Sequence, residues 1–159
     1  MSTQTLATRK VSLPSPTVFI ALVYALTVGF TELWFAGDIV FTDVDPYAND
    51  GPVESMVAIG IIGTAALVLV VALGSWLVRR PERAKAGAVV LATLSIVTML
   101  FFWSGAPGII GAGAAWQAGL LRGGRPQLGA ARVAGIVGLF AAALNVALTV
   151  GGLLIELAQ

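Results

Sequence analysis

The chain has 159 residues, of which 58% are hydrophobic and only 11% are charged, and its formal net charge is +1. A soluble globular domain carries about 25% charged residues, so this composition leaves too little polar surface for a water-soluble particle and predicts an integral membrane protein. The sequence contains no Cys and no His, which excludes disulfides, thiol nucleophiles, imidazole ligands for zinc or haem, and a catalytic triad built on histidine.

The first residues of the chain, 1–16, are polar, and Pro14 and Pro16 oppose a helix within them. We expect this segment to be a mobile tail on the cytoplasmic side of the membrane. Residues 17–159 are far more apolar, and we expect them to form a single transmembrane helical domain.

The first apolar segment, residues 17–37, follows Arg9 and Lys10 and so has the outline of a signal peptide. It is long for the apolar region of such a peptide, and Trp34 and Phe35 stand where a cleavage site needs small residues. We therefore expect this segment to remain in the protein as its first membrane span.

Five apolar segments in all predict an all-α bundle of five transmembrane helices. They cover residues 17–37, 53–78, 84–103, 107–121 and 133–157. The fourth segment has about 15 residues and covers ~23 Å of a hydrocarbon core that is ~30 Å thick. Two arrangements remain open for it: a full fifth crossing, or four spans with a short or re-entrant segment.

Basic residues decide the expected orientation. With the N-terminus inside and five crossings, the inner side receives Arg9, Lys10, Arg79, Arg80, Arg83, Lys85, Arg122, Arg125 and Arg132. The outer side receives Asp38, Asp43, Asp45, Asp50, Glu54 and Glu156, and only Glu82 joins the basic side. The positive-inside rule then places the N-terminus in the cytoplasm and the C-terminus outside. The expected location is a bacterial plasma membrane.

Helices in lipid associate through small residues and a few interhelical hydrogen bonds, so small and polar stripes indicate the faces that pack. The last span carries Gly138, Ala142, Asn145, Thr149, Gly152 and Glu156 along one line. The first span carries Ala21, Ala25, Gly29, Glu32 and Ala36, and the fourth carries Gly111, Ala115 and Gly119. We expect these three faces to meet in the interior of the bundle.

Glu32 is the one carboxylate set within an apolar span some residues before its end, and no basic residue lies in any span. If the first and last spans are neighbours, Thr149 lies at a similar depth and Asn145 a turn deeper. These three residues form a candidate intramembrane polar site. Glu32 then has two interpretations: a carboxylate that couples proton or cation transport, or a structural group held by hydrogen bonds.

The outer loop concentrates five carboxylates: Asp38, Asp43, Asp45, Asp50 and Glu54. Three of them follow the first, third and twelfth positions of a calcium-binding EF-hand loop, but Tyr47 and Ala48 replace the ligand and the glycine that such a loop requires. We therefore expect a solvated acidic turn, no metal site and no cofactor. An enzyme that uses this loop is the last of the functional hypotheses.

Three kinds of partner are compatible with the pattern. The inner basic loops suit anionic lipid, although residues 79–85 are equally explained by topology alone. Small-residue faces suit another membrane protein or a second copy of the chain. No aromatic–basic pattern for nucleic acid is present. The first functional hypothesis is therefore a non-enzymatic accessory or scaffold subunit, and the second is a small transporter that uses Glu32.

Overall fold

The computed structural model describes residues 14–43, 45–49 and 51–158, and this part of the chain is helical, with no strand. The elements are α1 (Pro16–Tyr24), the π-helical turn η1 (Ala25–Gly29), α2 (Phe30–Phe41), α3 (Pro52–Leu77), α4 (Pro81–Thr98), the 3-10 turn η2 (Met99–Ser104), α5 (Ala106–Gln117) and α6 (Ala130–Leu157). Four helical segments, which we call rods, are long and apolar enough to cross a membrane: Pro16–Phe41, Pro52–Leu77, Pro81–Ser104 and Ala130–Glu156. The predicted all-α membrane bundle is confirmed.

Prolines start three of the four long rods. Pro16, Pro52 and Pro81 each lie in the first helical turn, where the missing N–H costs nothing because it would have no acceptor within the helix. Ser15 caps the first rod by accepting a 3.4 Å hydrogen bond from the N–H of Val18. These local signals explain why the rods begin close to the predicted boundaries.

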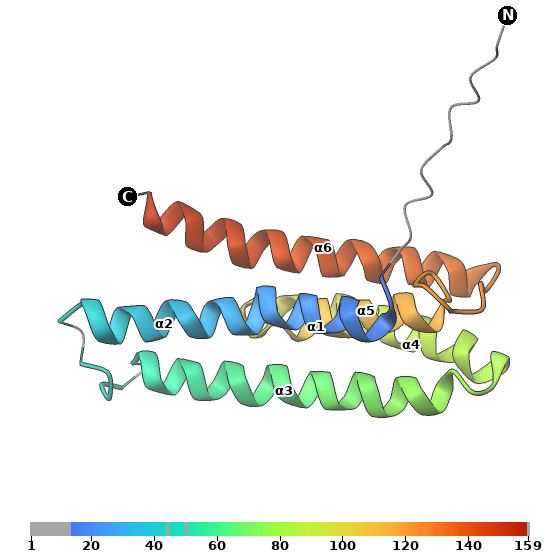
Figure 1. The fold of residues 1–159 in the computed structure, drawn as a ribbon, viewed down its shortest axis with the longest axis horizontal. Coiled ribbons are helices and arrows are strands. Elements are labelled where there is room, and N and C mark those ends of the chain that lie inside the picture. The colour runs from blue at the N-terminus through green and yellow to red at the C-terminus, as the bar shows by residue number, and fades with distance from the viewer. Residues whose placement is uncertain (1–13, 44, 50, 159) are drawn as a thin grey trace, which may run out of the picture.

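The two described chain ends lie at opposite ends of the bundle (Figure 1). α5 has 12 residues, which span about 18 Å of a hydrocarbon core that is roughly 30 Å thick, so it is too short to cross alone. Of the two predicted arrangements, the helix lengths fit four long spans with a short fifth segment. α5 nevertheless reverses the chain between α4 and α6, as a five-helix threading requires (Figure 1).

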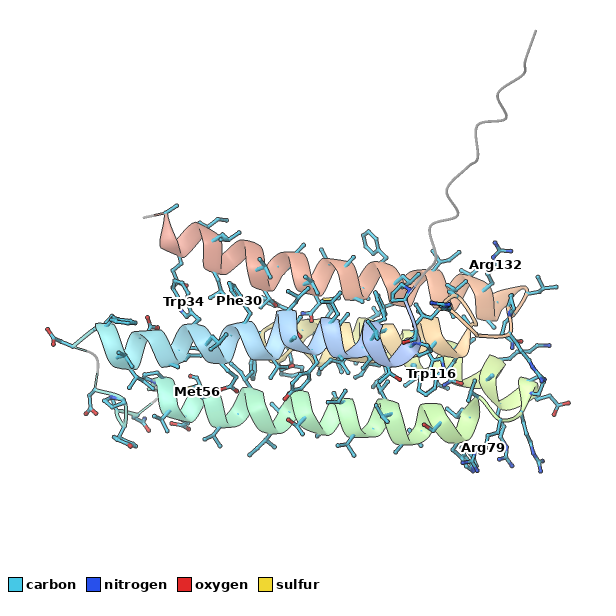
Figure 2. All side chains as sticks on the ribbon, viewed as in Figure 1. Phe30, Trp34, Met56, Arg79, Trp116 and Arg132 are labelled. Carbon is cyan, nitrogen blue, oxygen red and sulfur yellow. The ribbon has the colours of Figure 1, made fainter. Side chains whose placement is uncertain are left out.

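Charged residues divide between the two ends of the bundle. We call one the basic end: it holds the α3–α4 turn and the α5–α6 loop, with Arg79, Arg80, Arg83, Lys85, Arg122, Arg125, Arg132 and the single acidic residue Glu82. We call the other the acidic end: it holds Asp38, Asp43, Asp45, Glu54 and Glu156. Figure 2 shows Arg79 and Arg132 near one end and Trp34 near the other. Arg9, Lys10 and Asp50 lie outside the described residues.

α5 fills the centre of the bundle. Every residue from 104 to 115 is buried, and α5 packs against α1, α3, α4 and α6. The closest approach is to α6, where Gly111 and Gly138 face each other: a Cβ built on Gly138 would lie 2.5 Å from the carbonyl oxygen of Gly111. The two backbones come this close because neither residue has a side chain, which is the packing that small residues permit in lipid.

The turn that precedes α5 lies inside the bundle. At Gly105 the backbone has φ +71°, and a Cβ there would meet the side chains of Thr27 and Val28. Gly63 of α3 packs on the same turn, through the carbonyl oxygen of Ser104. Because Gly63 is eleven residues from the start of α3, the turn lies about 16 Å below the acidic end of that helix.

The first rod buries a different face from the one predicted. Ala21 and Ala25 are exposed, and a Cβ on Gly29 would have no neighbour within 4 Å, so Gly29 is not a packing position within the bundle. The turn η1 explains the shift: an extra residue in one helical turn directs both Thr27 and Val28 inward. The prediction assumed a regular period of 3.6 residues, which a π turn breaks.

Gly119 also has a different role from the one predicted. It lies beyond the end of α5 with φ +69°, and the Leu120 N–H donates to the Ala115 carbonyl at 3.1 Å while the Gly119 N–H donates to Trp116 at 3.0 Å. These two bonds form a Schellman motif, which needs a left-handed residue at this position. Gly119 therefore ends the helix, and only Gly111 and Ala115 of the predicted ridge lie within it.

Candidate functional site

Asn145 lies near the middle of α6 and is completely buried. Its Nδ2 donates to the carbonyl oxygen of Phe102 at 2.6 Å, and its Oδ1 accepts from the N–H of Gly108 at 3.2 Å. The first partner belongs to the end of η2 and the second to the first turn of α5. Asn145 therefore caps α5 from another helix. It pairs the Gly108 N–H, which would otherwise be unpaired in an apolar interior, and adds a second donor to the Phe102 carbonyl, which also accepts from the Gly105 N–H at 3.2 Å.

Two serines serve the same turn. Ser95 of α4, fully buried, donates its hydroxyl to the carbonyl oxygen of Pro107 at 2.7 Å. Ser104 donates to the carbonyl oxygen of Phe101 at 2.7 Å and accepts from the N–H of Ala106 at 3.3 Å. Irregular backbone at membrane depth is tolerated only where protein groups satisfy it. From the sequence alone Ser95 could face the bundle or bond its own helix backbone, and the structure shows that it faces α5.

Glu32 does not face α6, where its predicted partner lies. Its Oε1 lies against α3, where a Cβ on Gly60 would be 3.1 Å away. The buried hydroxyl of Thr149 has no hydrogen-bond partner among the described residues, so the hypothesised Glu32–Thr149 bond is not formed. The structure thus does not bring the three candidate residues together. Asn145 bonds backbone groups around the start of α5, and Glu32 of α2 lies against α3. The Thr149 hydroxyl has no hydrogen-bond partner among the described residues.

The described residues 45–49 of the α2–α3 connection, at the acidic end, form turns. Asp45 accepts the N–H of Tyr47 on its side chain at 3.0 Å, and the Gly51 N–H donates to the carbonyl oxygen of Ala48 at 2.9 Å. Such Asx chemistry is typical of turns. Within the described ranges, no three His, Cys, Asp or Glu side chains come close enough to hold a metal ion.

A cavity at the acidic end takes in one of the predicted loop carboxylates. Its volume is about 410 Å³, and Glu54 lines it together with Thr31, Phe35 and Trp103. Asp38, Asp43 and Asp45 are not part of its lining, so the structure does not gather the predicted acidic cluster around one pocket.

A second cavity, at the basic end, was not anticipated as a pocket. It has a volume of about 440 Å³. Among its lining residues are Arg79, Arg122, Arg125, Trp116, Gln117 and Gln127. We call it the arginine cavity. The sequence carried one signal for it, the glycine- and arginine-rich stretch between α5 and α6, but only the fold shows that this loop returns over the end of α5.

Gln117 is the most buried polar residue in the arginine cavity. It is 1% exposed, and its Nε2 donates to the carbonyl oxygen of Gly74 at 3.0 Å. Its Oε1 has no hydrogen-bond partner in the described part of the chain. Because the bond to a carbonyl fixes which end of the amide carries the hydrogens, the unpaired atom is an acceptor.

No family model, no curated protein and no solved structure matches the chain. Only the geometry of the described residues bears on function. That geometry consists of a closed centre capped by Asn145, turns at residues 45–49 and a cavity lined by arginines, all within a multi-pass helical membrane bundle.

Proposed function

We propose that the chain is a non-enzymatic accessory or scaffold subunit of a bacterial plasma membrane, with its basic end in the cytoplasm. The observation that carries this proposal is the filled centre of the bundle, because residues 104–115 are all buried. A transporter built on Glu32 needs a polar path that continues toward Asn145. The amide of Asn145 is instead fully buried, and both of its polar atoms are engaged by backbone.

The outward face of the first rod supports a docking role. Ala25 is exposed, and Gly29 and Gly37 have open space where a Cβ would lie. Small residues on a lipid-facing surface allow a second helix to approach closely. The partner that fits this face is therefore a transmembrane helix, from another membrane protein or from a second copy of the chain.

The charge division supports the orientation. All seven described basic residues lie at one end of the bundle, and Lys and Arg are retained on the cytoplasmic side during insertion. Because the chain has no cysteine, single cysteines can test this directly. Tyr47→Cys at the acidic end should react with a membrane-impermeant thiol reagent in intact cells, and Leu128→Cys at the basic end should react only after the cells are opened.

A site-specific photocrosslinker tests the docking role in native membranes. Placed at Ala25, it should yield one discrete protein adduct, whereas at Ala143, an exposed position on α6, it should yield none. An adduct of twice the chain's mass would identify a homodimer. Equal labelling at both positions, or no adduct at Ala25, would contradict the proposal, as would ion flux in vesicles of the purified chain that Glu32→Gln abolishes.

A further inference from the structure

The arginine cavity has the charge and donors of an anion-binding site. Arg79 extends from the end of α3, and Arg122 and Arg125 come from the α5–α6 loop. None of the three forms an ion pair with a carboxylate within residues 14–43, 45–49 and 51–158. Glu82, the one carboxylate of this end, is not part of the lining. Unpaired guanidinium groups are well suited to phosphate, to which they donate two parallel hydrogen bonds.

The loop that carries two of these arginines is anchored to the bundle. The Arg122 N–H donates to the carbonyl oxygen of Pro14 at 3.1 Å, and the Gln127 N–H donates to the carbonyl oxygen of Ala118 at 3.0 Å. Gly119 lies directly beneath the backbone of Arg125, where a side chain would clash. The guanidinium groups therefore extend from a fixed backbone, which reduces the entropy lost when a ligand binds.

Gln117 closes the buried wall of the cavity. Its Oε1 has almost no accessible surface and lies toward α4, 3.6 Å from where a Cβ on Gly87 would be, so it does not face a ligand in the cavity. The cavity therefore selects its ligand by charge, through the arginines. Inorganic phosphate alone has the charge but leaves the adjoining apolar surface open.

An apolar groove adjoins the arginine cavity. It has a volume of about 700 Å³ and runs between α1 and α3, with Thr17, Ile20 and Ala21 on one side and Leu67, Val68 and Val71 on the other. Trp116 lines both spaces, and Figure 2 shows it near the basic end, between α1 and α3. Both volumes lie in the range of about 300–1,000 Å³ that is usual for ligand sites.

We propose that the arginine cavity and the groove together bind one anionic glycerophospholipid. The arginines hold its phosphate, and one acyl chain lies in the groove between α1 and α3. The position suits a lipid, because the cavity opens at the end of the apolar rods, where headgroups lie. The groove reaches Ala21, one helical turn before Ala25, so the lipid site adjoins the docking face of the first rod. The two roles are tested separately, lipid binding on the purified chain and docking by crosslinking in native membranes.

The test measures thermal stability of the purified full chain in neutral detergent during titration with single lipids. Phosphatidylglycerol should raise the melting temperature, whereas phosphatidylcholine should not. Phosphatidylethanolamine, which has donors but no net charge, should act only weakly. Arg122→Gln/Arg125→Gln should weaken the phosphatidylglycerol effect at least about tenfold in half-saturating concentration. Arg132→Gln, at the same end but outside the lining, should leave it within about twofold.

A groove variant separates a lipid from a soluble anion. Ala72→Trp fills the groove and should reduce binding of phosphatidylglycerol without changing the response to glycerol phosphate. If inorganic phosphate or glycerol phosphate stabilises the chain as strongly as the lipid, the site takes a soluble anion and the proposal fails. It also fails if Arg132→Gln weakens lipid binding as much as the double variant, because the effect would then be general attraction to positive charge.

Discussion

The two halves of the bundle are stabilised in different ways. Toward the basic end, α5 is surrounded by four other helices, and backbone meets backbone at Gly111 and Gly138. Beyond the turn at Gly105, toward the acidic end, the described helices are α2, the start of α3 and the end of α6, and Gly152 and Glu156 are exposed. A small residue therefore packs closely where another helix lies against it, as at Gly138, and remains exposed where none does, as at Gly152.

The largest effect on stability is expected at the contact between α5 and α6, where the backbones of Gly111 and Gly138 meet. Gly138→Leu places a side chain against the carbonyl oxygen of Gly111, which cannot move without displacing α5. We expect a loss of about 3 kcal/mol in the free energy of unfolding, at the upper end of the usual cost of overpacking, because backbone and not a flexible side chain must move. Gly152→Leu on the same helix meets open space and should change stability little. Unfolding in mixed micelles measures both, and equal losses would show that the two halves are alike.

The second effect concerns two polar residues one turn apart on α6. Asn145→Leu leaves the Phe102 carbonyl and the Gly108 N–H without their side-chain partner, and we expect a loss of about 2–4 kcal/mol in the free energy of unfolding. Thr149→Val keeps the shape and removes a hydroxyl that has no partner. It should be neutral within about 0.5 kcal/mol. A large loss for Thr149→Val would restore the hypothesis of a bond to Glu32.

A smaller effect is expected at α4. Ser95→Ala removes the 2.7 Å bond to the Pro107 carbonyl and should cost about 1 kcal/mol in the free energy of unfolding. Thr98→Ala removes only bonds to the helix's own backbone, from the hydroxyl to the carbonyl oxygens of Leu94 and Ser95, and should cost less. The same unfolding assay distinguishes them, and the reverse order would mean that Ser95 does not hold the α5 turn.

The smallest effect is expected at Glu32. It is partly exposed, and no donor contacts it among the described residues, so Glu32→Gln should change the free energy of unfolding by less than about 0.5 kcal/mol. Gly60→Ala alters the same contact from the α3 side, because its Cβ would lie 3.1 Å from the Glu32 Oε1. If Glu32→Gln alters stability by several times this amount, the carboxylate has a partner that the described contacts do not account for.

Sequence patterning predicted the helices and the separation of charge because both follow from properties that add along the chain. Hydrophobic length decides which segments form rods, and prolines mark where they begin. On α6 the predicted stripe is buried as far as Thr149, since Gly138, Ala142, Asn145 and Thr149 are all buried. The prediction holds there because α6 is a regular helix.

Features that depend on irregular backbone or on three-dimensional neighbours escaped prediction. The π turn at η1 changed which face of the first rod is buried, and a left-handed φ made Gly119 a cap. The arginine cavity required knowledge that the α5–α6 loop folds back beside Pro14. Such pairings join residues far apart in the sequence, and neither periodicity nor composition encodes them.

The capping of α5 by Asn145 has a consequence for synthesis of the protein. The ribosome makes α5 before α6, so during translation the first turn of this short helix emerges without the amide that completes it. The core can close only after α6 has entered the bilayer. Until then the Gly108 N–H lacks its acceptor, so closure of the bundle around α5 depends on insertion of α6.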